Sequence, residues 1–196
     1  MKSNLIKSIK ITLAFCVFFS VFYIFILWAF AQVASPNKGN AELVILDGKV
    51  VGAAHVGQAF IQPIYFWGRP SAVDYAADGS GGSNHGPSNP EHLKEVEKRI
   101  NAFLAAHPYL ERKDIPADIV TASSSGLDPH ISPKAAYIQV KRVAQARGMD
   151  EEKLKALVDA HVEKPLLGLF GTSRVNVLKL NVALEENSFS CLFLSK

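Results

Sequence analysis

A charge-free apolar stretch near the N-terminus constrains this chain more than any other feature. Residues 11–31 include no charged side chain, and only Thr12 and Ser20 among them are plainly hydrophilic. As a helix the stretch rises about 31 Å at 1.5 Å per residue, which matches the hydrocarbon thickness of a bilayer. Trp28 near its far end suits the aromatic belt of a membrane interface. We therefore predict a membrane-spanning helix over residues 11–33.

The end of this stretch also carries a candidate processing site. Ala29-Phe30-Ala31 has the A-x-A form that signal peptidase cleaves, so a removed signal peptide is the alternative to a retained anchor. The apolar stretch is, however, longer than the roughly 7–15 residues of a typical signal core. Its length favours a retained anchor.

The distribution of charge predicts the orientation of the chain. Of the 21 Lys and Arg residues, three precede the span, at positions 2, 7 and 10, which leaves 18 against 18 Asp and Glu residues. The positive-inside rule keeps residues 1–10 in the cytoplasm and sends the rest across the cell (inner) membrane. The remaining domain is charge-balanced and lacks the basic surface of nucleic-acid-binding proteins, so we expect no nucleic-acid partner.

The fold that we predict is α+β: one N-terminal transmembrane helix followed by a small extracytoplasmic mixed α/β domain. Residues 34–42 read as a polar linker, residues 43–185 as the domain, and residues 186–196 as a tail without an assigned function. Cys16 lies in the predicted span and Cys191 in the tail, so we expect no intramolecular disulfide. A domain of this size can be stable through its hydrophobic core alone.

Three segments have strand signals. Residues 43–51 read as two short strands joined by Asp47-Gly48, a strong hairpin signal. Residues 60–68 are aromatic and apolar and favour a further short strand. Residues 175–184 alternate, with leucine or valine at positions 178, 180, 182 and 184, which predicts a strand central to a small sheet.

Three helices are predicted from their start and stop signals. Asn89, Ser132 and Asp150 can each cap a helix, and the first two are followed by proline at the first helical position. We expect the second helix to end at Gly148 and the third before Pro165.

The segment 121–133, TASSSGLDPHISP, carries the residue types of a hydrolase. Ser123, Ser124 or Ser125 with Asp128 and His130 would supply nucleophile, acid and base. The partners of such a triad usually converge from distant segments, and the chain has no G-x-S-x-G elbow. We therefore favour a structural turn, permitted by Gly126, in which Asp128 and His130 bond the backbone.

Metal and phosphate chemistry have weaker signals. The six histidines show no H-x-x-x-H spacing, although separate loops can bring His85 together with Asp128 and His130. The glycine-rich residues 79–83 resemble an anion-binding loop but lack the G-K-[ST] ending of a nucleotide site.

Four segments together resemble a known family. They are YFWGRPSA (65–72), SGGSNHGPSNP (80–90), TASSSGLDPHISP (121–133) and RVNVLKLN (174–181). They are similar, in this order and behind a single span, to the F-x-G-R-P-S, S-G-G-S-N-x-G-P-S-N-P, T-A-S-x-S-G-L-D-P-H-I-S-P and R-V-N-V-L-x-L-N motifs of the C subunit of Kdp-type potassium-transporting ATPases. Two parts depart from the pattern: residues 168–174 lack the family's usual acidic-proline approach, and the tail extends past the family domain.

The resemblance assigns structural or docking roles to the loop residues of these motifs. They are Gly68, Arg69, Pro70, Ser71, Ser80, Gly81, Gly82, Ser83, Asn84, Gly86, Pro87, Asn89, Gly126, Asp128, His130, Ser132, Arg174 and Asn176.

The resemblance also implies a function. It implies a non-catalytic accessory subunit that stabilises a high-affinity, ATP-driven potassium uptake complex. The implied partners are a potassium-conducting subunit, a P-type ATPase subunit, a small membrane subunit and membrane lipid. ATP and K⁺ are then handled by the complex, with no cofactor on this chain, and a catalytic-chaperone role in raising ATP affinity is indirect. The alternatives are a membrane-anchored extracytoplasmic hydrolase using the 121–133 loop and a solute-binding domain with a processed N-terminus.

Overall fold

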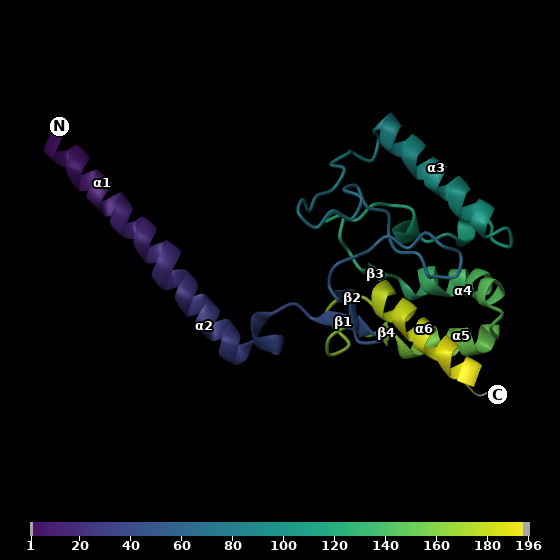
Figure 1. Ribbon diagram of the computed structural model, residues 1–196. Helices are drawn as coiled ribbons and strands as arrows, with labels where there is room; N and C mark the ends of the chain where they lie inside the picture. The colour runs from purple at the N-terminus through teal and green to yellow at the C-terminus, as the bar shows by residue number, and fades with distance from the viewer. Residues whose placement is uncertain (1, 194–196) are drawn as a thin grey trace. The chain divides into compact units, whose positions relative to one another are not determined.

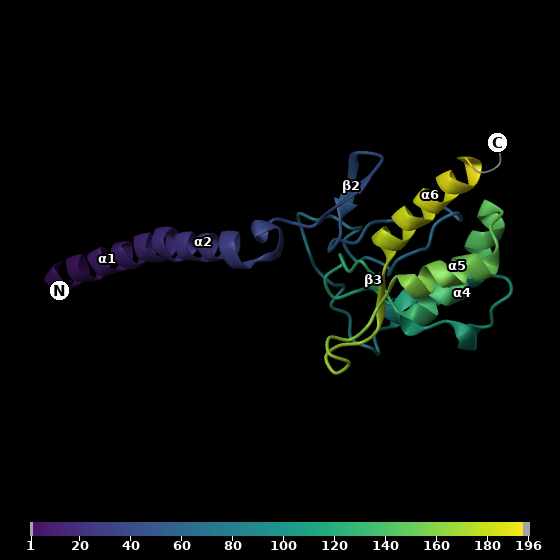
Figure 2. The same ribbon diagram turned by 90° about the horizontal axis from the view of Figure 1, so that it is seen from below.

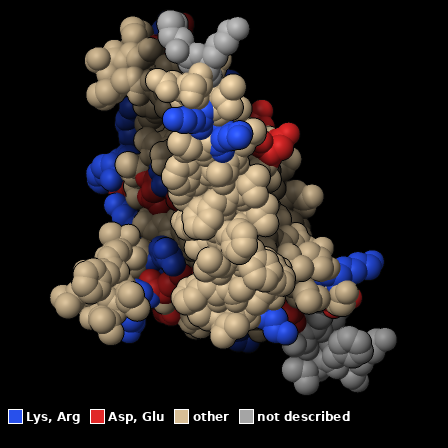
Figure 3. Space-filling model, turned by 90° about the vertical axis from the view of Figure 1, so that its left-hand side faces the viewer, with Lys and Arg blue, Asp and Glu red and all other residues tan. Residues whose placement is uncertain are grey.

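The computed structural model describes residues 2–193, and the chain divides into two compact units at Glu42/Leu43. The first unit is a continuous helix made of α1 (Lys2–Val17), the π-helical η1 (Phe18–Tyr23) and α2 (Ile24–Ala34), followed by the short η2 (Pro36–Gly39) (Figure 1). Its segment Ser3–Ala34 is long and apolar enough to cross a membrane. In Figure 3 the surface of this helix is mostly uncharged, with basic residues gathered near its N-terminal end.

The second unit begins with the predicted β-hairpin. Strands β1 (Leu43–Leu46) and β2 (Lys49–Ala53) pair antiparallel, with Leu46 opposite Lys49. Asp47 and Gly48 have φ angles of 51° and 74°. Two consecutive positive φ angles make the type I′ turn that matches the twist of a hairpin, so this prediction is confirmed.

The three capped helices are also confirmed. They are α3 (Pro90–Ala106), α4 (Pro133–Arg147) and α5 (Glu151–Ala160). The side chains of Asn89, Ser132 and Asp150 accept hydrogen bonds from backbone amides of the first turn, as N-caps do. Gly148 ends α4 with a φ of 64°. The third helix ends at Ala160, earlier than its proline signal indicated, because a strand follows at once.

That strand belongs to a small antiparallel sheet of β3 (His130–Ile131), β5 (Arg174–Asn176) and β4 (Val162–Glu163), in this order. The central strand β5 pairs Val175 with both Ile131 and Val162. The short η3 (Arg112–Asp114) and η4 (Ala117–Ile119) lie between α3 and β3. The observed architecture is mixed helix and strand, as predicted.

The long strand expected over residues 175–184 is wrong beyond its first two residues. The chain turns into α6 (Val177–Phe193) directly after β5. Asn176 caps this helix by accepting a hydrogen bond from the backbone amide of Lys179 at 3.1 Å. Buried residues then recur at positions 177, 180, 181 and 184, which is helical spacing. The alternation of apolar residues that indicated a strand also fits one broad helical face. The helix also extends into the predicted tail.

The core lies among α4, α5, α6 and the segment of residues 60–68. Figures 1 and 2 show α4 and α5 side by side, and α5 contacts α6. The side chains that expose 1% of their surface or less include Phe66, Val140, Val143, Leu154, Val158, Leu180 and Leu184. Burial of this apolar surface is the main force that holds the second unit together.

The strand expected over residues 60–68 is also wrong, and the reason is a pair of buried amide side chains that we call the amide clamp. Asn181 accepts a hydrogen bond from Phe66 N–H at 2.9 Å and donates one to Phe66 C=O at 2.9 Å. Gln139 does the same for Trp67, at 2.8 Å and 3.2 Å. The segment therefore obtains from side chains the backbone partners that a neighbouring strand would supply.

Two arginines of α4 extend this support. Arg142 donates to the carbonyls of Pro63 and Tyr65, and its guanidinium lies 4.1 Å from the ring centroid of Trp67. Arg147 donates to Ile64 C=O at 2.7 Å. Three successive carbonyls, those of residues 63–65, thus accept hydrogen bonds from charged groups, and such bonds are stronger than neutral ones.

His107 completes this buried network in its neutral form. Its Nε2 accepts a hydrogen bond from Arg142 Nε at 2.8 Å, and its Nδ1 donates to Phe103 C=O at 2.8 Å. Burial, which dominates, and the charge of Arg142 lower the pKa of His107 from 6.5 to about 4, against the raising effect of the Phe103 carbonyl.

Replacing Asn181 by alanine should remove the amide clamp from Phe66. Two buried backbone groups then lose their partners, so we expect the free energy of unfolding to fall by about 3 kcal/mol. Asn187→Ala on the exposed face of the same helix removes only a solvent-exposed bond to Ala183 C=O and should cost less than about 0.5 kcal/mol. Urea unfolding of the full chain in detergent, followed by tryptophan fluorescence, measures both. Equal losses would contradict the clamp.

Acidification should destabilise the protein through His107. Between its unfolded pKa of 6.5 and its folded pKa of about 4, the unfolded state binds a proton that the folded state does not. Stability therefore falls as the pH drops through this window, by up to about 3 kcal/mol. His107→Gln should be less stable at pH 7 but should lack this component. Unfolding free energies of both chains at several pH values test the difference, and parallel curves would rule it out.

Candidate functional site

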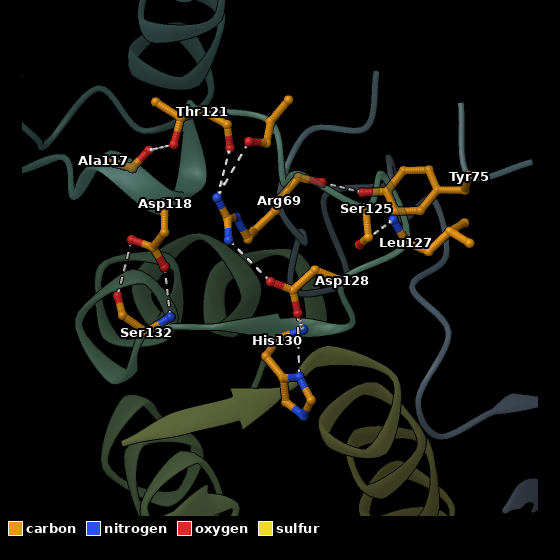
Figure 4. A network of polar contacts seen from close by, with 11 residues as sticks. Arg69, Tyr75, Ala117, Asp118, Thr121, Ser125, Leu127, Asp128, His130 and Ser132 are labelled. Carbon is orange, nitrogen blue, oxygen red and sulfur yellow. Dashed lines mark hydrogen bonds and ion pairs between the residues drawn. The ribbon is translucent and has the colours of Figure 1, made fainter. Parts of the chain in front are cut away.

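Three loops of the second unit meet to form the candidate site. They are residues 68–75, 80–82 and 121–132, which we call the loop cluster, and they contain most residues singled out in the sequence. Figure 4 shows Arg69 lying between the backbone at Thr121 and the side chain of Asp128. The contacts below explain how segments so far apart in the chain are held together.

Arg69 is the central cation of the loop cluster. Its Nη1 lies 3.1 Å from Asp128 Oδ2, and its Nη2 donates to the carbonyls of Thr121 and Ala122 at 3.5 Å and 3.4 Å. Its Nε is buried and has no hydrogen-bond partner within the described part of the chain. The guanidinium thus joins the first loop to the start of the third loop and to Asp128 within it.

Asp128 is held as a permanent anion. Its Oδ1 accepts hydrogen bonds from the backbone N–H of His130 at 3.0 Å and from the imidazole Nδ1 at 3.3 Å. Burial raises the pKa of this carboxyl, but the bonds from His130 and the guanidinium of Arg69 outweigh it and lower the pKa to about 2. Asp128 thus bonds the backbone as the turn interpretation expects, whereas the His130 imidazole contacts the carboxylates of Asp128 and Glu163. A carboxylate with so low a pKa is a weak base for catalysis.

Ser71 folds the first loop against the third. Its hydroxyl donates to Gly126 C=O at 2.7 Å and accepts from the backbone amides of Val73 and Tyr75 at 3.1 Å and 2.9 Å. The Tyr75 hydroxyl donates back to Arg69 C=O. All the polar capacity of Ser71 is used inside the loop cluster.

Glycines allow the backbones of the second and third loops to touch. Ser80 Oγ and Gly81 N–H both donate to Ser125 C=O, each at 2.9 Å. Gly126 has a φ of +69°, and a Cβ placed on it would lie 2.5 Å from Val73 Cγ2 and 2.8 Å from Gly81 O. At Gly82 a Cβ would lie 3.0 Å from Ser124 O. Side chains are therefore excluded at Gly126 and crowded at Gly82.

The loop cluster gives no support to a hydrolase. Ser123 is 3% exposed, and its backbone N–H donates to Pro70 C=O at 3.3 Å. The hydroxyl of Ser125 accepts from Leu127 N–H at 3.1 Å. Among residues 2–193, no hydrogen bond joins a hydroxyl of these serines to His130, whose Nε2 lies 3.9 Å from Glu163 instead. A nucleophile-base pair is not formed.

A metal site from separate loops is not formed either. His85 contacts Asn89 through Nδ1 at 3.4 Å, and its ring lies 6.1 Å from that of His92. The described residues contain no group of three His, Cys, Asp or Glu side chains placed to hold a metal ion. The set of His85, Asp128 and His130 is therefore not brought together.

The remaining predicted residues lie at the end of the loop cluster or outside it. Ser132 caps α4 and binds the carboxylate of Asp118, with its N–H at 2.6 Å and its hydroxyl at 3.2 Å. Asn89 caps α3, and residues 83–87 lead into it as an exposed loop in which Asn84 has a φ of 54°.

The last predicted motif lies on the sheet. Arg174 Nε donates to Glu163 Oε2 at 2.8 Å across neighbouring strands. Asn176 donates to Ala54 C=O at 2.6 Å while it caps α6. It therefore ties the β-hairpin to the helix, and His130 opposite it continues the link to the loop cluster.

Sequence reasoning missed the buried residues that hold the segment leading into the loop cluster. Gln139, Arg142 and Asn181 lie on helices but are buried. A sequence signal for them does exist: each is a polar residue at a helical position where the repeat of buried residues calls for an apolar one. Gly57 was missed too: its N–H donates to Leu127 C=O at 2.7 Å, and a Cβ on it would lie 2.7 Å from Asp128 O.

These features define an α+β domain behind an apolar helix, with polar loops that are hydrogen-bonded to one another. The chain belongs to the KdpC family, because the family model described as K+-transporting ATPase, c chain matches residues 5–186. A potassium-transporting ATPase KdpC subunit of Bacteroides thetaiotaomicron is 70% identical over 94% of this chain and 98% of its own length. Those of Flavobacterium psychrophilum and Caldanaerobacter subterraneus are 57% and 52% identical over 93% and 92% of this chain, and 98% and 93% of their own lengths.

Replacing Gly126 by alanine should disrupt the loop cluster. The new methyl group meets Gly81 O and Val73 at less than 3 Å in a left-handed backbone conformation, so we expect a loss of more than about 2 kcal/mol. Gly79→Ala is the matched control, because a Cβ there meets nothing within 4 Å. Urea unfolding of the two full-length variants gives the comparison. A Gly126→Ala chain as stable as the control would contradict the crowding described above.

Proposed function

We propose that this chain is the accessory subunit that stabilises an ATP-driven potassium uptake complex. The observation that carries the proposal is that polar side chains of the loop cluster form their hydrogen bonds within it. Arg69, Ser71 and Asp128 all have partners inside the cluster. A rigid surface of this kind suits docking, whereas an enzyme needs a reactive group that remains available for a substrate. The family name and the relatives' names, which are those of a potassium-transporting ATPase subunit, support the same conclusion.

The apolar helix supplies the attachment to the complex. Its large apolar side chains from Leu5 to Val33 each expose half of their surface or more, so the helix itself buries none of its apolar face. Such a helix requires lipid or the spans of other membrane chains around it. We assign these contacts to lipid, the potassium-conducting subunit, the P-type ATPase subunit and the small membrane subunit.

The orientation that we propose keeps the N-terminus in the cytoplasm and the second unit outside. It is supported by Lys2, Lys7 and Lys10, which all precede the apolar stretch, while no acidic residue does. ATP and K⁺ are then bound by the other subunits, and this chain makes no direct contact with ATP. Any increase in ATP affinity that it causes is a conformational effect transmitted through the complex.

Affinity purification from potassium-starved cells tests the assembly role. The tagged full-length chain, extracted in mild detergent, should bring membrane partners and a potassium-stimulated ATPase activity that is lost when residues 11–33 are deleted. His130→Ala should lower the recovered activity roughly fivefold, since one charge-assisted hydrogen bond contributes on the order of 1 kcal/mol. His92→Ala, a half-buried histidine outside the loop cluster, is the control and should recover the wild-type amount.

Three preparations decide between the alternatives: the intact complex, the complex that lacks this subunit, and the purified chain alone. In the indirect role, the complex that lacks this subunit should have a higher KM for ATP, and a photoreactive ATP analogue should label only other subunits. Labelling of this chain in an intact complex would overturn that role. A purified chain that hydrolyses a test ester alone, and loses this activity in His130→Ala, would overturn the accessory function itself.

A further inference from the structure

The loop between β4 and β5 exposes several large apolar side chains to solvent. Residues 165–171, which we call the apolar loop, include Leu166, Leu167, Leu169 and Phe170, which expose 70%, 81%, 80% and 64% of their surfaces. In Figures 1 and 2 this yellow-green segment projects from the second unit as a separate loop. Single exposed apolar residues are ordinary, but four bulky ones in a tip of five residues mark an interaction surface.

The turn at the tip shows that the fold itself does not call for these side chains. Leu167 and Gly168 have φ angles of 54° and 73°, almost the same as the 51° and 74° of Asp47 and Gly48 in the β-hairpin. Such a type I′ turn strongly prefers Asn-Gly or Asp-Gly, and leucine is costly at positive φ. The β-hairpin follows this preference, whereas the apolar loop carries leucine against it.

Four backbone N–H groups of the apolar loop, those of residues 166, 168, 169 and 170, donate to carbonyls within the loop. Leu166 N–H and Phe170 N–H each bond the other residue's carbonyl at 3.0 Å. Gly168 N–H bonds Pro165 C=O at 3.0 Å, and Leu169 N–H bonds Leu166 C=O at 3.1 Å. A segment that enters an environment poor in water has to satisfy its polar backbone groups in this way.

Charge and chain length favour a lipid surface as that environment. Residues 165–173 carry no charge, and the exposed Lys164 precedes them, while Arg174 at the other end is paired with Glu163 at 2.8 Å. A lysine beside an apolar tip suits the anionic headgroups at a bilayer surface. The linker 35–42 spans at most about 28 Å when fully extended, so an anchored domain stays near the bilayer.

We propose that the apolar loop inserts into the boundary between headgroups and acyl chains and gives the domain a second contact with the membrane. Leu167, Leu169 and Phe170 enter the apolar side of this boundary, and Lys164 remains among the headgroups. The domain is thereby held at two points, the spanning helix and the loop tip, which restricts its rotation about the linker. The inference rests on the proposed membrane anchor but not on the protein subunits assigned above as partners.

Depth-dependent fluorescence quenching of the full-length chain tests the insertion. A bimane label is placed at Leu169→Cys in a chain with Cys16→Ser and Cys191→Ser, reconstituted alone in phosphatidylcholine–phosphatidylglycerol vesicles containing a nitroxide-labelled lipid. The control label is at Leu93→Cys on α3, a leucine that is 55% exposed. Because insertion brings the label about 5–10 Å into the boundary, quenching at position 169 should exceed the control at least about threefold.

Leu167→Asn provides the matched variant. Asparagine suits the turn better than leucine, so the chain remains folded, but the tip loses one apolar anchor. Quenching of the label at position 169 should fall toward the control value. Equal quenching at positions 169 and 93, or no effect of Leu167→Asn, would overturn the proposal. Shielding of the label that occurs only in the assembled complex would overturn it as well, since the loop then fills a pocket of another protein.

Discussion

The hydrogen bonds that side chains give to the backbone of residues 63–67 are the interaction on which the rest of the second unit depends. The amide clamp of Gln139 and Asn181 holds Phe66 and Trp67 from two different helices, and Arg142 and Arg147 hold the carbonyls just before them. Phe66 is fully buried, and the clamp ties its segment to both α4 and α6. The loop cluster begins directly after this segment, at Gly68, so its first residue follows a firmly held backbone.

The charged groups of the domain are compensated both in the interior and near the surface. In the interior, His107 is neutral and accepts from the cation Arg142, so the network contains one charge and satisfies it with carbonyls and an imidazole. Nearer the surface, Arg69 and Asp128 compensate each other directly. Burying a charge is costly unless the charge is paired or hydrogen-bonded, and each of the two arginines donates to two backbone carbonyls.

The parts of the fold that sequence predicts are those that local chemistry decides. Asn89, Ser132, Asp150 and the Asp47-Gly48 turn act on their immediate neighbours, so the helices and the hairpin follow from the sequence. Residues 60–68 and 177–184 do not, because their partners lie up to 115 positions away. The same limit applies to the site: the bond from Asp128 to His130 N–H is local and predictable, whereas the meeting of Arg69 with Asp128 depends on the whole tertiary fold.

The direct passage from β5 into α6 has a mechanical consequence. Asn176 is a strand residue, a helix cap and the partner of Ala54 C=O, so no flexible loop separates the sheet, the helix and the hairpin. The hairpin is where the linker from the spanning helix joins the domain. A displacement of the hairpin is therefore passed through Asn176 directly to α6 and to the edge strand at His130.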